Sequence, residues 1–453
     1  MIKKDLTQGA ITQGMLLFAI PMILGNLLQQ LYNVADTFIV GKFLGANALA
    51  AVGSAYTLMV FITSIILGLC MGSGAIFSIH FGAKKMHELK NSIYVSFLMI
   101  ASITIIINIL VFLFLDPIMH LLQVPDEIYN MMKEYLQVIG IGISFTFLYN
   151  YISSLLRAIG DSVIPLLFLA VSAILNVVLD VVFVAGIHMG VAGAAAATVI
   201  AQAVSAIGIL LYCVLKSDIL TLEKEHRYIN RHVAGEIFQF SMLTCVQQSV
   251  MNFGILMIQG LVNSFGTAVM AAFAVAVKID SFAYMPVQDF GNAYSIYTAQ
   301  NFGARKPDRI RKGTKIAFLL STCFCLVISL LVCLFAKPLM EIFIDSKETE
   351  ILAIGVQYLR IEGTFYVGIG CLFLWYGYYR AVKKPGMSVV LTVISLGVRV
   401  MLAYMLAPIP SIGVLGIWWA IPIGWFLADL VGILYYVKSR KSIEQIAEGK
   451  LAV

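Results

Sequence analysis

The stretch GANALAAVGSAYTLMVFITSIILGLCMGSGAIFSIHFGAKK, residues 45–85, decides the fold because the chain contains it twice. It aligns without gaps on residues 266–306 with 9 identities in 41 positions, and the copies end in FGAKK and FGARK. Each copy is a long apolar run closed by a basic turn, as expected of a helix that spans a membrane. The alignment indicates an internal repeat, in which one architecture is built twice.

The composition of the whole chain agrees with a membrane environment. Of 453 residues, 60% are hydrophobic and 12% are charged, against roughly 25% charged in soluble domains. A globule of this length cannot bury so many apolar side chains, which excludes an ordinary soluble enzyme. The net charge of +6 is small and scattered, so we expect no nucleic-acid partner. The sequence has no P-loop, GxSxG or HExxH motif, and we expect neither catalysis nor a cofactor.

Apolar runs separated by polar or Gly/Pro-rich junctions predict twelve membrane-spanning helices. We expect an N-terminal lobe at residues 1–215, a cytoplasmic linker at 216–233, a C-terminal lobe at 234–437 and a cytoplasmic tail at 438–453. The expected fold class is an all-α integral membrane protein with one six-helix bundle in each lobe. The runs lie at 14–40, 48–81, 92–115, 134–156, 163–186, 190–215, 234–262, 268–300, 313–336, 351–379, 386–407 and 412–437.

Two more pairs of segments extend the repeat through both lobes. LRAIGD at Leu156 pairs with YRAVKK at Tyr379, and residues 176–193 pair with residues 399–416. The offset between the copies drifts only from 221 to 223. Because six spans is an even number, the copies lie parallel in the membrane, related by an axis near its normal. This organisation suits a transporter that rocks around a central site.

The basic residues predict the orientation in the membrane. With twelve spans both termini lie on one side, and the loops and termini on that side hold 23 Lys and Arg against 4 on the other. Positive charge is retained on the cytoplasmic side, so both termini are expected in the cytoplasm of a multi-pass protein of the cell (inner) membrane. We expect the lipid bilayer as its surroundings and a monomer as its state.

Nine charged residues remain inside the predicted spans, where each costs about 2.5 to 3.5 kcal/mol on insertion scales. Acids outnumber bases among them, which makes the interior attractive to cations. Some of these charges could instead form structural pairs between helices, but Lys278 and Asp280 are two positions apart and do not share a helix face. The nine are Lys278, Arg360, Arg399, Asp36, Asp180, Asp280, Asp289, Glu362 and Asp429.

Asp36, Asn176, Asp180 and Thr198 are expected at one level in the outer leaflet, since their depths agree within about 6 Å at 1.5 Å per residue. Their oxygens suit a small hard cation such as sodium, while two desolvated carboxyl groups could also share a proton. The sequence leaves both alternatives open. The aligned residues of the second copy are Met257, Arg399, Ala403 and Ile421, so the cluster is not repeated and favours a function over a structural role.

Other polar residues on the spans are candidates for a substrate cavity, although amide side chains also join helices structurally. We expect Pro21, fifteen residues before Asp36, to kink the first span and to serve as a conformational element. The cavity candidates are Gln29, Asn33, Asn150, Gln248, Asn252, Asp280, Tyr284 and Asp289.

IPMILGNLLQQLYNVADTFIVGKFLGANALAAVG (20–53), the FGA-K/R-K turns, and RAIGDSVIP (157–165) with NVVLD (176–180) together resemble the multidrug and toxic compound extrusion (MATE) family, prokaryotic type. The resemblance covers essentially the whole chain. It implies two six-helix lobes in a V around a central cavity, and export of cationic or amphipathic organic compounds against a proton or sodium gradient.

By position, the resemblance carries the role of cation coupling to Asp36, Asn176, Asp180 and Thr198, with sodium as a possible ligand, and the role of a bending proline to Pro21. The seventh span lacks the glutamate that several branches carry there, which leaves Asp280, Asp289 and Glu362 as substitutes at most. The resemblance implies antiport by alternating access, with small organic substrates.

Three other functions fit the sequence less well. A lipid-linked saccharide or lipid flippase of the same wider superfamily would need a basic cavity, which the acid-rich interior disfavours. An ion channel would need a pore-loop filter or a repeated ring of charge. An intramembrane enzyme would need a nucleophile and a base.

Overall fold

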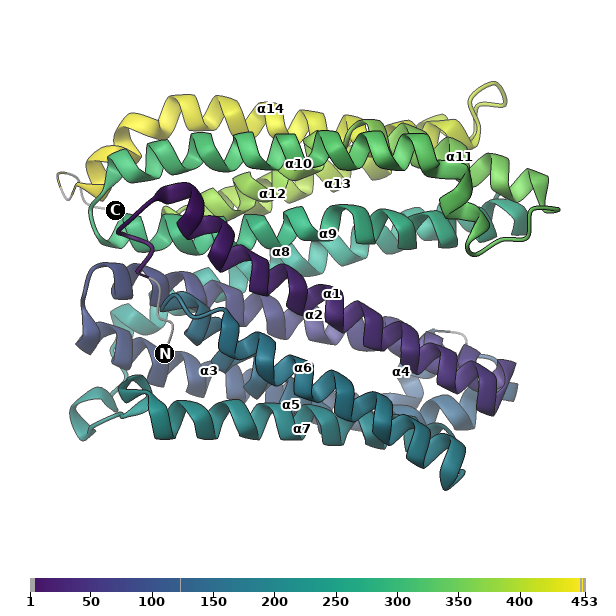
Figure 1. Ribbon diagram of the computed structural model, residues 1–453, viewed down its shortest axis with the longest axis horizontal. Helices are drawn as coiled ribbons and strands as arrows, with labels where there is room; N and C mark the ends of the chain where they lie inside the picture. The colour runs from purple at the N-terminus through teal and green to yellow at the C-terminus, as the bar shows by residue number, and fades with distance from the viewer. Residues whose placement is uncertain (1–4, 123, 449, 451–453) are drawn as a thin grey trace. The chain divides into compact units, whose positions relative to one another are not determined.

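The computed structural model describes residues 5–122, 124–448 and 450, and these residues form helices and turns without any strand (Figure 1). The all-helical fold class expected from the sequence is therefore confirmed. The described chain packs as two compact units. The first unit comprises Leu24–Phe81 and Lys85–Cys245; the second comprises Asp5–Ile23, Gly82–Lys84 and the described residues from Val246 onward.

Within the first unit the helices pack side by side, with α7 against both α5 and α6 (Figure 1). An apolar core joins α2, α3, α5 and α7, and includes the fully buried Phe77, Leu155 and Ile209. The helices that lie wholly or almost wholly in this unit are α2 (Ala46–Gly82), α3 (Met86–Leu113), α4 (Leu115–Leu121), α5 (Asp126–Ala158), α6 (Val163–Asp180) with the π-helical η1 (Val181–Gly186), α7 (Gly190–Lys216), and the 3₁₀ turns η2 (Asp218–Leu220) and η3 (Lys224–His226).

Within the second unit α12 packs between α9, α10, α13 and α14. Aromatic rings fill its centre, where Trp418 stacks on Phe273 with centroids 5.5 Å apart and meets Tyr358 edge-on at 4.8 Å. The helices of this unit are α9 (Thr267–Gly303), α10 (Pro307–Glu341), α11 (Thr349–Thr364), α12 (Tyr366–Ala381), α13 (Pro385–Leu406) and α14 (Val414–Ala447).

Eleven helices among the described residues are long and apolar enough to cross a membrane. The predicted span at 351–379 is instead divided into α11 and α12, because Phe365 leaves helical geometry at φ −109° and ψ 17°. Each half has 16 residues, too few to span alone. Together they supply the twelfth span.

Two helices are shared between the units. Helix α1 (Ile11–Leu44) enters the first unit at Leu24, and α8 (Arg231–Asn263) leaves it after Cys245. These two positions are 221 apart, the repeat offset, so the same point of the repeat is divided in both copies. The two packed units therefore differ from the lobes at 1–215 and 234–437, which stay a prediction.

The first part of α8 lies directly on α2 in the first unit. A Cβ atom at Gly68 would be 2.5 Å from Cys245 Cα, and one at Gly72 would be 2.5 Å from Ser241 Cα. The Ser73 and Ser241 hydroxyls are hydrogen-bonded at 2.9 Å. Two glycines four positions apart thus allow the backbones of α2 and α8 to approach closely, as in membrane helix pairs.

Basic residues occupy the left-handed position that ends three helices. Lys84, Arg305 and Lys383 have φ values of 57°, 57° and 60° after α2, α9 and α12. The following amide closes each turn, as when Lys85 N donates to His80 O at 3.0 Å and Lys306 N donates to Asn301 O at 3.0 Å. Glycine usually takes this position, but here each turn places a positive charge at a helix C-terminus, which the helix dipole stabilises.

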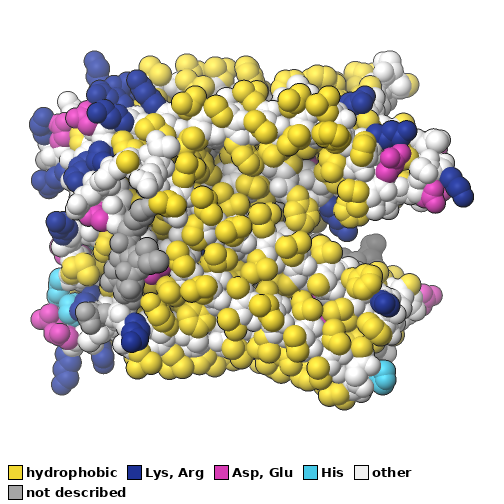
Figure 2. Space-filling model, in the orientation of Figure 1, with side chains coloured by type: hydrophobic (Ala, Val, Ile, Leu, Met, Phe, Trp, Pro, Cys, Tyr) yellow, Lys and Arg dark blue, Asp and Glu magenta, His cyan; other side chains and the backbone are white. Residues whose placement is uncertain are grey.

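On the face drawn in Figure 2, hydrophobic side chains cover the middle of the helices, and Lys and Arg gather mainly at one end of each unit. Large apolar side chains such as Leu215, Phe426 and Val437 are at least 70% exposed. An exposed apolar band between polar ends is the surface expected of a protein solvated by lipid.

The segment before α1 folds against α9 and α10 within the second unit. Arg309 donates from its guanidinium to the Gly9, Leu6 and Gln8 carbonyls at 3.0 to 3.2 Å, and also to Asn301 Oδ1. Lys306 Nζ donates to Thr7 O at 2.9 Å. Leu6 is 2% exposed, and its N–H donates to Gln300 Oε1. We call Asp5–Gly9 the N-terminal strap. The basic turn after α9 therefore binds a segment of the chain, beyond setting its orientation.

Candidate functional site

The first unit brings together the four residues that the sequence predicted as one cluster. Asp36 lies on α1, Asn176 and Asp180 lie one turn apart on α6, and Thr198 lies on α7. Asn176 is 2% exposed and Asp180 is fully buried. Asp180 is the last residue of α6 before the π-helical η1. Short π-helical segments occur often at functional sites because they change the direction of the side chains around them.

Hydrogen bonds orient the polar groups of this cluster. Asn176 Nδ2 donates to Thr198 Oγ1 at 3.2 Å, and Thr198 Oγ1 donates to Ala194 O at 3.1 Å. The Asn176 amide therefore donates one of its two N–H groups to Thr198, while its Oδ1 is buried and receives no hydrogen bond from any described residue.

The carboxyl groups of Asp36 and Asp180 lie within hydrogen-bonding reach of each other. Within the described parts of the chain, no donor reaches Asp36 Oδ1 or either carboxylate oxygen of Asp180. Two ionised carboxylates cannot satisfy one another, since both only accept hydrogen bonds. A shared proton or a bound monovalent cation would satisfy both groups, with Asn176 Oδ1 as a further oxygen ligand.

Tyr135 on α5 is a neighbour of this pair that the sequence did not single out. It is 6% exposed, and its ring lies close enough to Asp36 and Asp180 to respond to the charge of both. The repeat carried a usable signal, because EYL at 134–136 aligns with QYL at 357–359 at the offset of 223. A tyrosine present in both copies within polar spans is a candidate site residue.

A second buried polar cluster lies in the second unit. Asp280 on α9 is 3% exposed and Glu362 on α11 is 1% exposed, and their carboxyl groups are adjacent. Tyr358 Oη donates to Asp280 Oδ2 at 3.4 Å, and the Tyr366 hydroxyl donates to Asp280 Oδ1. Arg399 on α13 carries a positive charge in the neighbourhood of both acids, although the described residues show no ion pair between it and either of them. The sequence had named Asp280 for the cavity but not its tyrosine donors.

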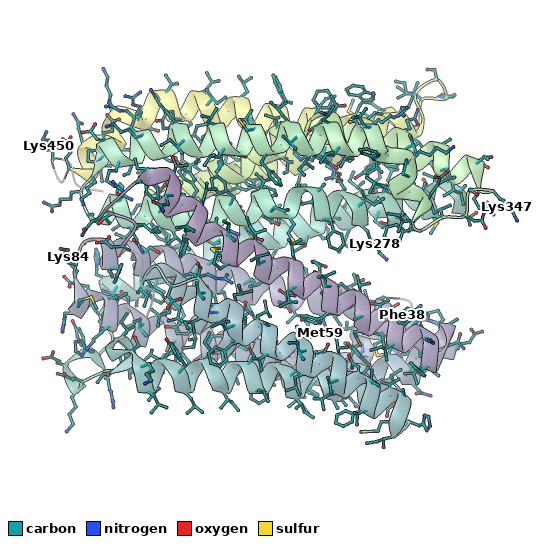
Figure 3. All side chains as sticks on the ribbon, viewed as in Figure 1. Phe38, Met59, Lys84, Lys278, Lys347 and Lys450 are labelled. Carbon is teal, nitrogen blue, oxygen red and sulfur yellow. The ribbon has the colours of Figure 1, made fainter. Side chains whose placement is uncertain are left out.

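Lys278 is exposed although Asp280 is buried, and the described residues contain no ion pair between them (Figure 3). This agrees with the expectation that two positions on one helix do not share a face. Arg360 is also exposed. Of the three basic residues predicted inside the spans, only Arg399 is thus associated with the buried acids.

The other cavity candidates are distributed over both units. Asn150 Nδ2 donates to Thr146 O at 2.8 Å, and Asn252 Nδ2 donates to Gln248 O at 3.1 Å, so both amides bond to their own helices. Asp289 is 3% exposed. Their role in binding substrate stays a prediction. Gln29, Asn33 and Asn150 belong to the first unit, and Gln248, Asn252, Asp280, Tyr284 and Asp289 belong to the second; Pro21 lies within the continuous helix α1.

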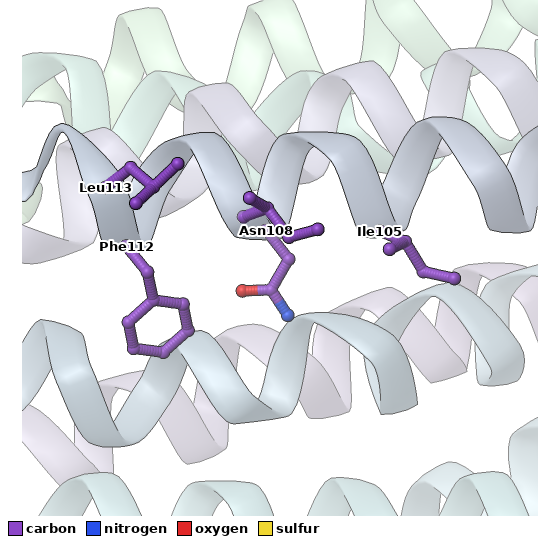
Figure 4. A pocket seen from close by; sticks show the side chains of 5 residues that line it. Ile105, Asn108, Phe112 and Leu113 are labelled. Atoms are coloured by element: carbon purple, nitrogen blue, oxygen red, sulfur yellow. The ribbon is translucent and has the colours of Figure 1, made fainter.

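A pocket of about 320 Å³ lies along α3 and contains none of the predicted site residues (Figure 4). Its lining is apolar except for Asn108, with Ile105, Ile109, Phe112 and Leu113 around it. Such a lining offers neither charge nor several convergent polar groups. We therefore do not assign the functional site to it.

His87, Glu225 and His226 have ligand atoms within 4.8 Å of one another, a spacing that a metal ion could use. However, the Glu223 N–H donates to His226 Nδ1 at 3.2 Å, which places the proton of a neutral ring on Nε2. That Nε2 faces Glu225 Oε1 at 3.5 Å. The geometry is that of a capped turn in the linker, and it does not suit a metal ligand.

Known proteins resemble this chain in both sequence and structure. The MatE family model matches residues 21–182 and 242–405, one match in each copy of the repeat. The probable multidrug resistance protein YpnP of Bacillus subtilis is 30% identical over 434 residues, which cover 95% of this chain and 96% of YpnP. The multidrug export protein MepA of Staphylococcus saprophyticus is 23% identical, with 97% of this chain and 96% of MepA covered.

Among solved structures, an outward-facing multidrug resistance transporter of the MATE family and MOP superfamily matches with a TM-score of 0.92. The two chains are 23% identical, and the match covers 98% of this chain and 99% of the other. This likeness concerns the fold, and it agrees with the twelve helices and two repeats inferred above.

Proposed function

This chain belongs to the MatE family, and we propose that it is a secondary active transporter that exports small organic compounds in exchange for protons or sodium ions. The names of its relatives, a probable multidrug resistance protein and a multidrug export protein, support export of several unrelated compounds. The proposed location is the cell membrane, with both termini in the cytoplasm and the chain acting as a monomer.

The observation that carries this proposal is the Asp36–Asp180 pair. The half-buried Asp36 and the fully buried Asp180 leave three of their four carboxyl oxygens without a donor among the described residues, which favours uptake of a proton or a cation, and sodium or protons are available outside the cell. Loading the pair removes the repulsion between α1 and α6, so it changes which packing of α1 is favoured. Pro21 lies on the same helix at the point where backbone hydrogen bonding is weakened.

Antiport requires that ion and substrate oppose each other's binding. If the conformation favoured by an ion at Asp36 and Asp180 binds substrate weakly, linkage requires that bound substrate weakens ion binding by the same factor. Substrate then leaves outward when the ion binds from outside. The acids buried in both units favour cationic or amphipathic substrates over anions.

The test uses purified protein in liposomes that contain ethidium as a fluorescent organic cation. A proton gradient and a sodium gradient are imposed separately, each without the other. We expect ethidium movement to follow one of the two gradients and to cease when an ionophore for that ion collapses it. Ethidium movement that is equal with and without both gradients would contradict coupled antiport.

A flippase is the alternative function. The same vesicles with a fluorescent lipid-linked pyrophosphate distinguish it, because a flippase moves that lipid between leaflets while ethidium stays in place. The acidic clusters at Asp36–Asp180 and Asp280–Glu362 would repel a pyrophosphate, so we expect no lipid movement above that in protein-free vesicles.

A further inference from the structure

A series of hydrogen bonds within the first unit leads from the Asp36–Asp180 cluster to a residue predicted for the substrate cavity. At its outer end, Asn176 Nδ2 donates to Thr198 Oγ1 at 3.2 Å. Gln202 lies one turn further along α7, on the same face as Thr198. Thr146 Oγ1 on α5 donates to Gln202 Oε1 at 3.1 Å, and Asn150 Nδ2 donates to Thr146 O at 2.8 Å. We call these five residues the polar ladder.

The packing of α5 against α7 makes room for the middle of the polar ladder. A Cβ atom at Gly142 would lie 2.8 Å from Gln202 Oε1 and 3.0 Å from Val199 Cγ2. Glycine at position 142 therefore allows the Gln202 carboxamide to lie against the α5 backbone, one turn from Thr146. The close approach and the hydrogen bond together fix the rotation of α7 relative to α5.

The second copy of the repeat has no equivalent of this hydrogen-bonded series. Thr198, Gln202, Thr146 and Asn150 align with the apolar or aromatic residues Ile421, Trp425, Ile369 and Phe373, and Gly142 aligns with Phe365, which lies between α11 and α12. Amide and hydroxyl groups often join membrane helices structurally, but such a role would serve the second copy equally well. The polar ladder occurs in the copy that contains the Asp36–Asp180 pair, which favours a role in coupling.

The Thr146 hydroxyl has two discrete arrangements. A hydroxyl has one proton to donate, and Thr198 donates its proton to Ala194 O, four positions earlier on its own helix, at 3.1 Å. Thr146 donates to Gln202 on the other helix, although the carbonyl four positions earlier is also within its reach in a helix. A shift of α7 that withdraws Gln202 therefore transfers the Thr146 hydrogen bond to α5 and leaves no donor unsatisfied.

We propose that Gln202 and Thr146 transmit ion binding at the Asp36–Asp180 pair to Asn150, and thereby set the factor by which ion and substrate weaken each other's binding. The inference rests on the function proposed above and names residues that couple its two ligands. Gln202 and Thr146 are positioning residues, because they act through their neighbours in the polar ladder.

The transmission follows the contacts of the polar ladder. An ion that takes Asn176 Oδ1 as a ligand displaces an amide that is hydrogen-bonded to Thr198. Thr198 and Gln202 move together, because they lie one turn apart on one helix. Loss of the Gln202 acceptor returns the Thr146 hydroxyl to α5 and changes the surroundings of the Thr146 carbonyl, which holds the Asn150 amide.

The test measures the coupling factor, which is the ratio of the ethidium dissociation constants with and without the ion. Ethidium fluorescence reports binding to the purified protein in sodium chloride against choline chloride, and separately before and after acidification. We expect the ion to weaken ethidium binding to the unmodified protein by about 5- to 150-fold. Gln202→Met keeps the length of the side chain but removes the acceptor, and should lower this factor by about 2- to 30-fold. A general loss of ethidium affinity does not change the ratio.

Matched variants separate coupling from a general effect on α7. Thr146→Val removes the donor of the same hydrogen bond and should lower the factor to a similar extent; it also decides the question if Gln202→Met does not fold. The double variant should lose no more than either single variant, since both break one link. Thr146→Ser keeps the hydroxyl and should retain the factor. Ser205→Ala, the control, removes a different hydrogen bond of α7, to Phe168 O at 3.1 Å, and should leave the factor unchanged.

The two possible failures give different results. If neither sodium nor protons weaken ethidium binding to the unmodified protein, the proposed function fails and the polar ladder has nothing to transmit. If the unmodified protein shows the factor and the folded Gln202→Met and Thr146→Val proteins retain it in full, their hydrogen bond only joins two helices and the inference is wrong. A loss in Ser205→Ala as large as that in Gln202→Met would also overturn it.

Discussion

The two units have the same helical framework and different buried polar chemistry. In the first, the acids come from α1 and α6 and have an asparagine and a threonine beside them; in the second, they come from α9 and α11 with an arginine and two tyrosines. Only the tyrosine at 135 and 358 is common to both.

The comparison distinguishes the helical framework, which the lipid environment requires in both copies, from the buried polar residues, which differ between the copies. Every spanning helix must satisfy its own backbone hydrogen bonds in lipid, so both copies retain their helices and the left-handed turns that end them. A buried charge needs only its own local partners, so each copy can solve that problem at different positions. A duplicated framework can therefore carry two buried acidic clusters whose polar partners differ.

We expect the largest effect from neutralising one acid of the Asp36–Asp180 pair in the first unit. We expect Asp36→Asn to reduce gradient-driven ethidium efflux to the level of protein-free liposomes while the protein reaches the membrane at normal abundance, because an amide neither takes up a proton nor supplies the negative charge that offsets a bound cation. Efflux from proteoliposomes at matched protein density measures this. Efflux as fast as that of the unmodified protein would rule out the coupling role of Asp36.

Asp116→Asn is the matched control for this loss. Asp116 lies outside the spans, where hydrogen bonds from Lys133 and Tyr129 lower the pKa of its carboxyl. A lowered pKa means that the carboxylate interactions are complete at neutral pH and are lost only as the pH falls through that lowered value. We therefore expect Asp116→Asn to leave both efflux and its pH dependence between about pH 5 and 8 unchanged.

The tyrosine donors sharpen the difference between the pairs. Tyr366→Phe removes a donor to buried Asp280 and should destabilise the protein by about 1.5 to 3 kcal/mol, the range for hydrogen bonds to charged groups. Tyr135→Phe removes a hydroxyl for which the described residues show no hydrogen bond to either first-unit acid, and should change stability by less. Thermal unfolding in detergent compares the melting temperatures of the two variants. Equal shifts would mean that both tyrosine hydroxyls contribute equally to stability.

Substitution of Gly72 tests whether the residue found at the equivalent position of the second copy fits in the first. Its repeat equivalent is Ala293, yet a Cβ at position 72 would lie 2.5 Å from Phe240 O and Ser241 Cα. We expect Gly72→Ala to lower stability by about 1 to 3 kcal/mol through overpacking between α2 and α8. Gly53→Ala, with no atom within 4 Å, is the control and should not lower the melting temperature. A neutral Gly72→Ala would show that α8 can move away freely.

The smallest expected effect concerns the N-terminal strap. Arg309 aligns with Glu88, so the first copy of the repeat has no guanidinium at the equivalent position. Arg309→Ala removes hydrogen bonds to Leu6, Gln8 and Gly9, and should raise amide hydrogen exchange at residues 6–9 with little change in melting temperature. Lys312→Ala on the same helix is the control. Unchanged exchange would mean that Lys306, Gln300 and Asn301 suffice.

The sequence predicted the framework well because lipid imposes a long, legible pattern. The apolar runs predicted the membrane-spanning helices, and the internal repeat predicted which helix of the first copy corresponds to which helix of the second. The break at Phe365 was not predictable from hydropathy, since its flanks are as apolar as those of an unbroken helix. The division of α1 at Leu24 and of α8 at Cys245 between the two units was also not predictable, because it depends on packing between helices that are far apart in the chain.

At the candidate site, depth and helical spacing were enough to group Asp36, Asn176, Asp180 and Thr198. They could not reveal that the Asn176 amide donates to Thr198, because that hydrogen bond depends on the rotation of the side chain. Tyr358, Tyr366 and Arg399 come from three helices and were not grouped with Asp280. Packing between helices far apart in the chain leaves no signal in hydropathy or local spacing, and only the aligned tyrosines offered one.

The N-terminal strap is synthesised long before the residues that bind it. Leu6 binds Gln300, a partner 294 positions later. At about 5 to 20 residues per second, roughly 15 to 60 s pass after Leu6 is made before the ribosome supplies Gln300. Throughout that interval the strap has none of its α9 and α10 partners, so residues 5–9 stay unbound in a chain halted before Gln300 and are bound once α9 and α10 are complete. Binding of the strap therefore depends on synthesis of the second copy through the start of α10.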